Sequence, residues 1–476
     1  MYKNPKSRVI LRDFKTQFFD CPIGVRQGDC LSPTLFSIFI NDLAEETKAS
    51  GIGIELDKDI LINILLYADD IVIMAENEND LQDLLNIVEN WCRCWRLEVN
   101  LAKTNIMHVR PKRKECSKFM FLFNKRDIPY CQEYKYLGCL LNEHLDFSRT
   151  TSVLVDSAGR ALSSIITKMI KNGGLPFNVF CTLYQACVSS IADYGGEVFG
   201  YNEYECAKKL HTRAARSYLG VNKLTPVCGI LSEFNQLMPH YRRRLKMVRF
   251  YHRLLTCSDN LTAKIVFKWD KQLNIDEIVK SWFSEVKEIF YHYENTNIEN
   301  LGSSFHLGVL TDRISSTMLK LQQTQLKTEC HQSPKLRTFI LFKDFFSTAT
   351  FLKKPLSFIQ RKYLAKIRLG CLELGIETGR YSRPIIPAEE RFCQVCENGQ
   401  DSIEDEFHFI MECDRYNFER VRWLNSLAVA PNLQETDRAT IFKTVLNEPE
   451  NLKLTAQFLI SCFDIRSNFI GNQKRK

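Results

Sequence analysis

Two adjacent aspartates, Asp69 and Asp70, stand between two apolar runs at residues 62–67 and 71–75. Both runs are β-prone, so the pattern predicts a hairpin with the acids at its turn. Hard carboxylate oxygens suit Mg²⁺, and two such ions can stabilise the attacking and the leaving oxygen of a phosphoryl transfer. The pair is therefore predicted to bind Mg²⁺ in a phosphoryl-transfer site.

A lone Asp-Asp dipeptide is more often a plain turn between two core strands. An upstream block favours the metal site instead. Residues 24–33 read Gly-Val-Arg-Gln-Gly-Asp-Cys-Leu-Ser-Pro, and an apolar helix-like run follows at 35–40. Its two glycines let a backbone approach a nucleotide closely, and Arg26 can meet a phosphate. Ser32 and Pro33 predict a capped helix start.

Two downstream blocks complete an ordered series. Residues 95–104 read Trp-Arg-Leu-Glu-Val-Asn-Leu-Ala-Lys-Thr, and residues 134–139 read Tyr-Lys-Tyr-Leu-Gly-Cys. The four blocks, within residues 15–145, resemble the reverse-transcriptase motifs lettered B, C, D and E. Their order and their amino-acid sequences are most similar to those of non-LTR retrotransposons of the long-interspersed type. The resemblance implies an RNA-directed DNA polymerase that uses Mg²⁺, an RNA template, a DNA primer and deoxynucleoside triphosphates.

The resemblance also implies roles for single residues. Asp69 and Asp70 match the metal-binding pair of motif C, and Tyr67 would face the growing primer end. Lys103 matches the motif D lysine, an acid for the leaving pyrophosphate, although a solvated lysine after a turn explains this position equally well. The positions that match motif B, which touches nucleotide and template, are Arg26, Gln27 and Gly28. The positions that match the primer-grip hairpin of motif E are Tyr136, Leu137 and Gly138.

The family pattern further requires motif A, a strand ending in an aspartate that shares both metal ions. Only Asp13 and Asp20 precede the first block, and neither has that strand-then-helix setting. Asp20 instead lies in a stretch that reads as a hairpin leading into the block. We therefore expect a chain cut before motif B, without the third carboxylate and the fingers, and no catalysis by residues 1–476 alone.

A second chemical cluster lies near the carboxyl end. Cys393 and Cys396 are separated by two residues, His408 follows after eleven more, and Cys413 after a further four. Three thiolates and one imidazole predict a closed, structural Zn²⁺ site, since no position is left for water. The set resembles the CCHC motif that follows the polymerase in many non-LTR elements. Its central gap is longer than in retroviral knuckles, so single-strand binding does not follow from it.

Helical spacing dominates the middle of the chain. Residues 153–171 place apolar side chains at helical intervals with bases between them, which resembles a polymerase thumb. Residues 240–253 interleave bases with aromatics, and this composition suits phosphates and stacked bases. The predicted nucleic-acid contacts are Arg242, Arg243 and Arg244. A core-facing helix with a solvated basic face explains the same segment nearly as well.

Composition limits the remaining possibilities. The 476 residues carry a net charge of +8 from 64 basic and 56 acidic residues, which permits a polyanionic partner without demonstrating one. Eighteen cysteines without an apolar leader predict reduced thiols. No apolar run is long enough for a bilayer, so we expect no membrane contact and an intracellular protein, nuclear or cytoplasmic. The acids Glu404, Asp405 and Glu406 read as a solvated face.

These patterns predict an α+β fold with four parts. They are a partial reverse-transcriptase palm (1–145), a helical thumb and connector (146–385), a CCHC zinc-binding module (386–425) and a helical tail (426–476). The leading interpretation is a non-LTR reverse transcriptase or its carboxy-terminal half. A catalytically dead nucleic-acid-binding remnant and a zinc-stabilised interaction protein are the alternatives.

Overall fold

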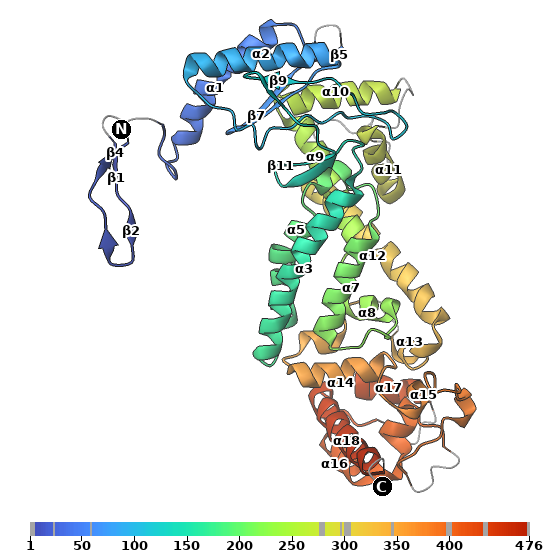
Figure 1. Cartoon of the computed structure of the whole chain (residues 1–476). Coiled ribbons are helices and arrows are strands. Elements are labelled where there is room, and N and C mark those ends of the chain that lie inside the picture. The colour runs from blue at the N-terminus through green and yellow to red at the C-terminus, as the bar shows by residue number, and fades with distance from the viewer. Residues whose placement is uncertain are drawn as a thin grey trace. The chain divides into compact units, whose positions relative to one another are not determined.

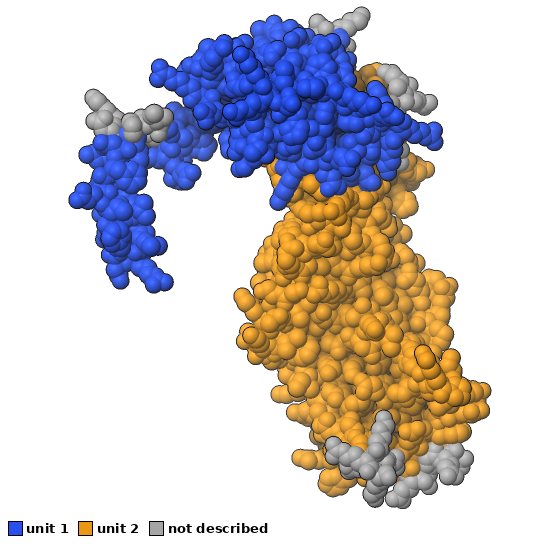
Figure 2. Space-filling model, in the orientation of Figure 1, with its two compact units in different colours: residues 1–136, 141–146 blue, residues 137–140, 147–476 orange. Residues whose placement is uncertain are grey.

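The computed structural model describes residues 5–21, 24–57, 60–275, 281–295, 298, 306–343, 347–396, 402–431 and 437–473. The chain divides into two compact units, coloured differently in Figure 2. The first contains residues 1–136 and 141–146, and the second contains residues 137–140 and 147–476. Among the described residues, strands occur only before residue 143. The α+β prediction therefore holds in a coarser form, a mostly helical chain with small hairpins near its amino end.

The first unit combines short antiparallel strand pairs with two long helices (Figure 1). Its described elements are β1 (Lys6–Ser7), β2 (Ile10–Leu11), β3 (Phe14–Lys15), β4 (Phe19–Asp20), α1 (Ser32–Ala49), β5 (Ile54–Asp57), β6 (Ile60–Ile62), β7 (Ile64–Tyr67), β8 (Asp70–Ile73), α2 (Glu78–Trp95), β9 (Leu122–Phe123), β10 (Arg126–Asp127) and β11 (Glu133–Tyr136), with β12 (Cys139–Asn142) at the boundary. Asp20 pairs with Lys6 across β1 and β4, as the expected hairpin requires.

Helix α1 begins where the sequence predicts, but its cap differs. The N-cap residue is Leu31, and Ser32 is the first helical residue, followed by Pro33 in the first turn. The Ser32 hydroxyl donates to the Arg26 carbonyl at 2.6 Å, so it braces the preceding loop and leaves the helix N–H groups uncapped. The predicted helix is thus confirmed, and the predicted capping role of Ser32 is wrong.

The core of the first unit lies between α1, α2 and the strands. Leu43 and Leu84 are fully buried, and Trp91 is 2% exposed. Asn77 caps α2 by accepting the Asp80 N–H at 3.0 Å, and Arg96 ends the helix in the left-handed conformation. This core carries the β7–β8 hairpin.

The second unit is helical throughout its described part. Its helices are α3 (Phe147–Lys171), α4 (Phe177–Tyr184), α5 (Ser190–Ala192), α6 (Gly196–Phe199), α7 (Glu205–Leu219), α8 (Val227–Phe234), α9 (Pro239–Thr256), α10 (Thr262–Ile275), α11 (Trp282–Glu294), α12 (Leu307–Gln332), α13 (Phe339–Phe342), α14 (Phe358–Arg368), α15 (Gly375–Thr378), α16 (Asn417–Ser426), α17 (Arg438–Leu446) and α18 (Leu452–Gln473). Short 3₁₀ and π turns are η1 (Gln185–Ser189), η3 (Pro334–Leu336), η4 (Thr350–Lys353), η5 (Ala388–Glu390), η6 (His408–Glu412) and η7 (Asp414–Tyr416). None of the described helices is long and apolar enough to span a membrane.

One continuous apolar core runs through this unit and includes the cysteine cluster. Ala158, Ile165 and Met169 of α3 are buried in it, at the helical spacing that the sequence shows. Cys393 and Cys413 belong to the same core. The described residues of the predicted zinc module therefore pack within a larger helical body.

The three consecutive arginines of α9 are mostly occupied within the protein. Arg243 is 1% exposed, donates to the Ala192 carbonyl at 2.7 Å and lies 3.3 Å from the Asp193 carboxylate. Arg242 donates to the other oxygen of Asp193 at 2.8 Å. Arg244 donates to the Tyr293 hydroxyl at 2.6 Å. Arg243 is therefore paired inside the fold, whereas Arg242 and Arg244 are half-buried, and the phosphate contacts of these two arginines stay a prediction.

The acidic run 404–406 also differs from the predicted solvated face. Glu404 is 1% exposed and accepts two hydrogen bonds from Arg466, at 2.7 and 2.8 Å. Glu406 is 2% exposed and accepts two from Arg337, both at 2.7 Å. Two of the three acids are therefore buried ion-pair partners, since a buried carboxylate persists when an arginine binds both its oxygens.

A buried pair between Glu233 and Arg368 provides a stability test. Glu233 is fully buried, Arg368 is 1% exposed, and two guanidinium nitrogens donate to one Glu233 oxygen at 2.9 and 3.1 Å. Arg368→Met should destabilise the second unit by about 3–5 kcal/mol, because Glu233 stays buried without its main partner. Lys268→Met, which removes an exposed pair with Asp259, should cost less than about 1 kcal/mol. Denaturant unfolding of both variants measures the difference, and equal costs would contradict it.

Candidate active site and metal centre

The acidic pair lies at the tip of the β7–β8 hairpin, whose turn has two residues. Strands β7 and β8 pair antiparallel, with Tyr67 opposite Asp70, so Ala68 and Asp69 form the turn. Ala68 has a φ of 51°, in the left-handed region that glycine occupies more easily. Residues 67–70 are all exposed. The hairpin therefore presents both carboxylates to solvent on a backbone that holds one non-glycine residue under strain.

The base of this hairpin is anchored in the core. Ile64 and Leu66 lie opposite Ile73 and Ile71, and all four pack against the buried cluster of α1 and α2. Asn63, which is 5% exposed, donates its amide to the carbonyls of Thr47 and Ile52 at 2.7 and 2.9 Å. A satisfied buried amide fixes the register, because a one-residue slip would leave it unpaired.

The two carboxylates suit a divalent cation but do not form a complete site. Both are exposed, and their hard oxygens are the ligands that Mg²⁺ prefers. Within the described residues, the one group of three or more potential ligand side chains close enough to share an ion is the cysteine and histidine set, which includes neither aspartate.

The motif B residues lie in an exposed loop before α1. Arg26, Gln27 and Gly28 are all exposed, and Gly28 has a φ of 83°. The Arg26 carbonyl accepts the Ser32 hydroxyl, and Asp29 accepts the Leu31 N–H at 3.0 Å. Hydrogen bonds between its side chains and its backbone thus hold the loop, while the Arg26 side chain stays exposed.

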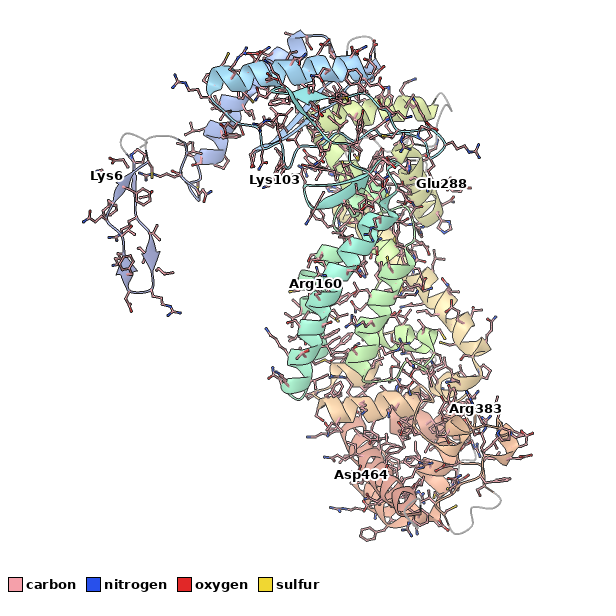
Figure 3. The ribbon with its side chains drawn as sticks, viewed as in Figure 1. Lys6, Lys103, Arg160, Glu288, Arg383 and Asp464 are labelled. Atoms are coloured by element: carbon pink, nitrogen blue, oxygen red, sulfur yellow. The ribbon has the colours of Figure 1, made fainter. Side chains whose placement is uncertain are left out.

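The motif D and E residues occupy turns of the same region. Lys103 is exposed (Figure 3), and its carbonyl accepts the Tyr134 hydroxyl at 3.3 Å. Burial and the negative charge of Asp70 raise the pKa of the Tyr136 phenol, which places that ring near the acidic tip. Leu137 and Gly138 both have positive φ, 46° and 87°, as a tight turn after β11 requires.

The cysteine and histidine set predicted to bind zinc is brought together. Its four ligand atoms lie within 4.8 Å of one another. The Sγ atoms of Cys393 and Cys413 are 4.0 Å apart, and Cys396 Sγ lies 3.7 Å from His408 Nε2. Tetrahedral Zn²⁺ with bonds of about 2.3 Å to sulfur separates two ligands by about 3.8 Å, so the set fits the ion. The hydrogen bond from Cys413 lowers the pKa of the Cys393 thiol to about 3, which favours a thiolate.

Neighbouring polar groups orient these ligands. His408 Nδ1 lies 3.4 Å from the Glu412 carboxylate, and the His408 N–H donates to Asp405 at 2.8 Å. Arg420 donates to the carbonyls of Ile410 at 2.8 Å and Cys413 at 2.5 Å. A carboxylate on the far nitrogen of a ligating histidine fixes its tautomer and raises its basicity.

Asp405 and Glu412, which contact His408, were not predicted from the sequence to support this cluster. Asp405 stands three residues before His408 at the start of a helical turn, a position where aspartate accepts backbone N–H groups. Glu412 follows His408 by four residues, so both share one helical face. The spacing of these two acids from His408 is the sequence pattern that could have indicated their contacts with it.

The comparisons with known proteins agree with the geometry of the hairpin. Residues 6–141 match the family model described as "Reverse transcriptase (RNA-dependent DNA polymerase)". The segment 6–141 is therefore a reverse transcriptase segment similar to those of non-LTR retrotransposons. It is 25% identical over 198 residues to the RNA-directed DNA polymerase from mobile element jockey of Drosophila melanogaster, which is 40% of this chain and 21% of that protein.

Two further relatives also match this chain over only part of their own length. It is 24% identical over 259 residues to the probable RNA-directed DNA polymerase from transposon BS of Drosophila melanogaster, covering 49% of this chain and 27% of that protein. It is 28% identical over 153 residues to the Pol polyprotein from type-1 retrotransposable element R2 of Nasonia vitripennis, covering 30% and 15%. The chain thus spans between about a seventh and about a quarter of the length of these relatives.

Proposed function

We propose that this chain supplies the metal-binding hairpin of an RNA-directed DNA polymerase that extends a DNA primer on an RNA template. The single observation that carries the proposal is the exposed pair Asp69–Asp70 at the tip of a core-anchored hairpin, inside the segment that matches the family model. The match to the jockey RNA-directed DNA polymerase, which is 25% identical over 40% of this chain, supports RNA-directed DNA synthesis as the reaction.

The other matched residues take positions around this hairpin in the proposal. Tyr67 supports the primer end, and the loop of Arg26, Gln27 and Gly28 contacts the incoming nucleotide and its template base. The turn of Tyr136, Leu137 and Gly138 grips the primer. Burial, and after it the negative charge of Asp70, raises the pKa of Tyr136, which is consistent with this role.

The proposed reaction joins the primer 3′ oxygen to the α-phosphorus of a deoxynucleoside triphosphate, and the bond to pyrophosphate breaks. The hydroxyl proton leaves to solvent. Lys103 is exposed and can protonate the pyrophosphate oxygen as it departs. Mg²⁺ held by Asp69 and Asp70 would offset the negative charge of the reacting phosphates. Every other contribution is positioning, which in phosphoryl transfer supplies much of the rate.

A second candidate is a nucleic-acid-binding protein without polymerase activity. One observation favours it: among the described residues, no third carboxylate gathers with Asp69 and Asp70. Under this alternative the zinc centre and the helical unit keep their structural roles, and the hairpin is inert. A zinc-stabilised protein-interaction module without nucleic-acid affinity is the remaining outcome.

Primer extension separates these candidates. The protein is assayed on an RNA template with a DNA primer and Mg²⁺ in two forms: residues 1–476, and the same chain preceded by the in-frame sequence encoded upstream at its locus. We expect incorporation from the extended form when that sequence encodes a strand-borne aspartate, and none from residues 1–476, since three carboxylates are needed to hold both ions.

Each result decides between the candidates. Incorporation by residues 1–476 alone would overturn the requirement for a third carboxylate. Primer-template binding without incorporation by either form supports the second candidate, and the absence of both supports the interaction module.

A further inference from the structure

The turn of Leu137 and Gly138, between β11 and β12, depends on contacts from outside its own hairpin. Both residues have positive φ, 46° and 87°, and Leu137 is not a glycine, so its backbone conformation costs free energy. The Leu137 side chain is 37% exposed, so its packing offsets little of that cost. A backbone in this conformation persists only when the surrounding structure holds it.

Tyr194, which follows α5 by two residues, supplies contacts to both residues of the turn. Its hydroxyl donates to the Leu137 carbonyl at 2.8 Å, although 57 positions separate the two residues in sequence. Its ring lies against Gly138, because a Cβ atom at that position would be 3.3 Å from Tyr194 Cε1, closer than an ordinary van der Waals contact. Glycine therefore serves both the positive φ and the close approach of the ring. Residues 137–140, the turn segment, belong to the second unit together with Tyr194.

The far end of the turn segment is held from the same unit. The hydroxyl of Thr150, which is 1% exposed, donates to the Leu140 carbonyl. Cys139 lies against the residue that follows Tyr194, since a Cβ atom at Gly195 would be 3.1 Å from Cys139 Sγ. Tyr194 and Thr150 thus fix the first and the last carbonyl of the segment.

Three cations of α9 fix the backbone that carries Tyr194. Helix α9 is labelled in Figure 1 and packs against α6. Arg242 donates to the Asp193 carboxylate at 2.8 Å, and Lys246 donates to the Asp193 carbonyl at 2.6 Å. Arg243 lies 3.3 Å from the other carboxylate oxygen. Asp193 is 2% exposed and is compensated by these cations, so the position of the next residue depends on α9.

Tyr194 contributes little to the apolar core. Its side chain is 45% exposed and does not belong to that core, whereas Tyr218 and Tyr251 of the same unit are 1% and 2% exposed. A half-exposed ring gains less free energy from burial than a fully buried one. The interactions of Tyr194 with the turn are therefore the main ones by which its side chain could serve the protein.

We propose that Tyr194 is a positioning residue for the primer, because it holds Leu137 and Gly138 in the conformation that contacts the primer strand. The inference rests on the proposed function and on the primer-grip role of this turn. Tyr194 acts through the turn and touches no reacting atom. Loss of its hydroxyl should displace the primer end and leave the overall affinity for nucleic acid unchanged, since the charge of the protein stays the same.

Photocrosslinking of the primer tests this role. An RNA template is annealed to a DNA primer whose last phosphorothioate carries an azidophenacyl group, and its complex with saturating residues 1–476 is irradiated. Mass spectrometry quantifies the crosslinked peptides of the wild type and of Tyr194→Phe, which removes only the hydroxyl. We expect the wild-type crosslink to map to residues 133–142, the β11–β12 hairpin. Its yield should fall about fivefold in Tyr194→Phe, because the net contribution of one hydrogen bond corresponds to a factor of about that size.

Tyr291→Phe is the matched control. Tyr291 of α11 is 68% exposed, so this variant loses the same hydroxyl at a position outside the turn contacts and should keep the wild-type yield. Tyr194→Ala also removes the ring that lies against Gly138 and should lower the yield further than Tyr194→Phe. Equilibrium affinity for the same primer-template should stay within about twofold in all three variants, since none of them changes a charge. A purely structural tyrosine would lower the unfolding temperature and leave the crosslink at saturation in place.

Each outcome supports or overturns the role of Tyr194. An unchanged crosslink in Tyr194→Phe, or an equal loss in Tyr291→Phe, overturns it, while primer binding and the proposed function stand. A wild-type crosslink that maps outside residues 133–142 shows that the turn is not the primer grip and overturns it as well. If residues 1–476 do not bind the primer-template, the inference fails together with the proposed nucleic-acid partner. Incorporation, which depends on Asp69, enters none of these measurements.

Discussion

Replacing Cys413 with serine should remove Zn²⁺ from the protein and unfold the segment that surrounds the metal centre. The wild type, purified under reducing conditions, is expected to carry about one zinc per chain, because four ligands at this spacing close the coordination shell. Metal analysis of both proteins measures the loss. A wild-type protein without zinc would refute the centre.

The structural consequence should be large and local. Structural Zn²⁺ contributes about 10–16 kcal/mol of apparent binding free energy to small zinc domains, and this energy is folding energy. Here Cys393 and Cys413 lie within the core that also holds Phe409, Ile410 and Trp423. Loss of the ion leaves buried thiols facing one another, so we expect faster hydrogen exchange across residues 402–431, while α3 and α7 keep their protection.

A buried cysteine outside the cluster provides the matched control. Cys462 of α18 is fully buried and belongs to no metal set among the described residues. Cys462→Ser should cost only the burial of a hydroxyl, about 1–3 kcal/mol, with zinc content unchanged. If both serine variants retain zinc and exchange alike, the four residues are a packed thiol cluster and nothing more.

Short sequence patterns predicted turns and helix starts correctly. The hairpin that carries Asp69 and Asp70 follows from two β-prone runs, and the start of α1 follows from the proline at position 33. The cysteine and histidine set that the structure brings together was predictable because its four residues follow a spacing typical of zinc sites. Each of these signals resides within a few neighbouring residues.

Long-range pairing was not predictable in the same way. The partner of Arg242 and Arg243 is Asp193, about fifty positions earlier, and the partner of Glu404 is Arg466, which lies 62 residues later. A charged residue looks the same in sequence whether it faces water or a distant partner, since burial of a charge depends on what the fold brings to it. Only the packing of the folded chain separates an exposed cation such as Arg160 from a buried one such as Arg243.

Replacing Asp69 with asparagine in the upstream-extended protein should abolish primer extension. The change keeps the size of the side chain and removes the charge that holds the cation, so it removes metal assistance without disturbing the hairpin core of Ile64, Leu66 and Ile71. Metal stabilisation of a phosphoryl-transfer transition state is worth several kcal/mol. At about 1.4 kcal/mol for each factor of ten, single-turnover incorporation should fall by about a thousandfold or more.

The accompanying variants separate chemistry from folding and binding. Asp83→Asn removes an exposed acid of α2 in the same unit and should leave the rate unchanged. Tyr67→Ala should lower the rate less than Asp69→Asn, because an aromatic ring positions the primer and carries no charge for the ion. Affinity for the primer-template should stay near the wild-type value in Asp69→Asn, since the change removes one of the chain's 56 acidic residues and none of its 64 basic residues. Undiminished incorporation by Asp69→Asn would show that the exposed pair is an ordinary turn and would remove the observation on which the polymerase proposal rests.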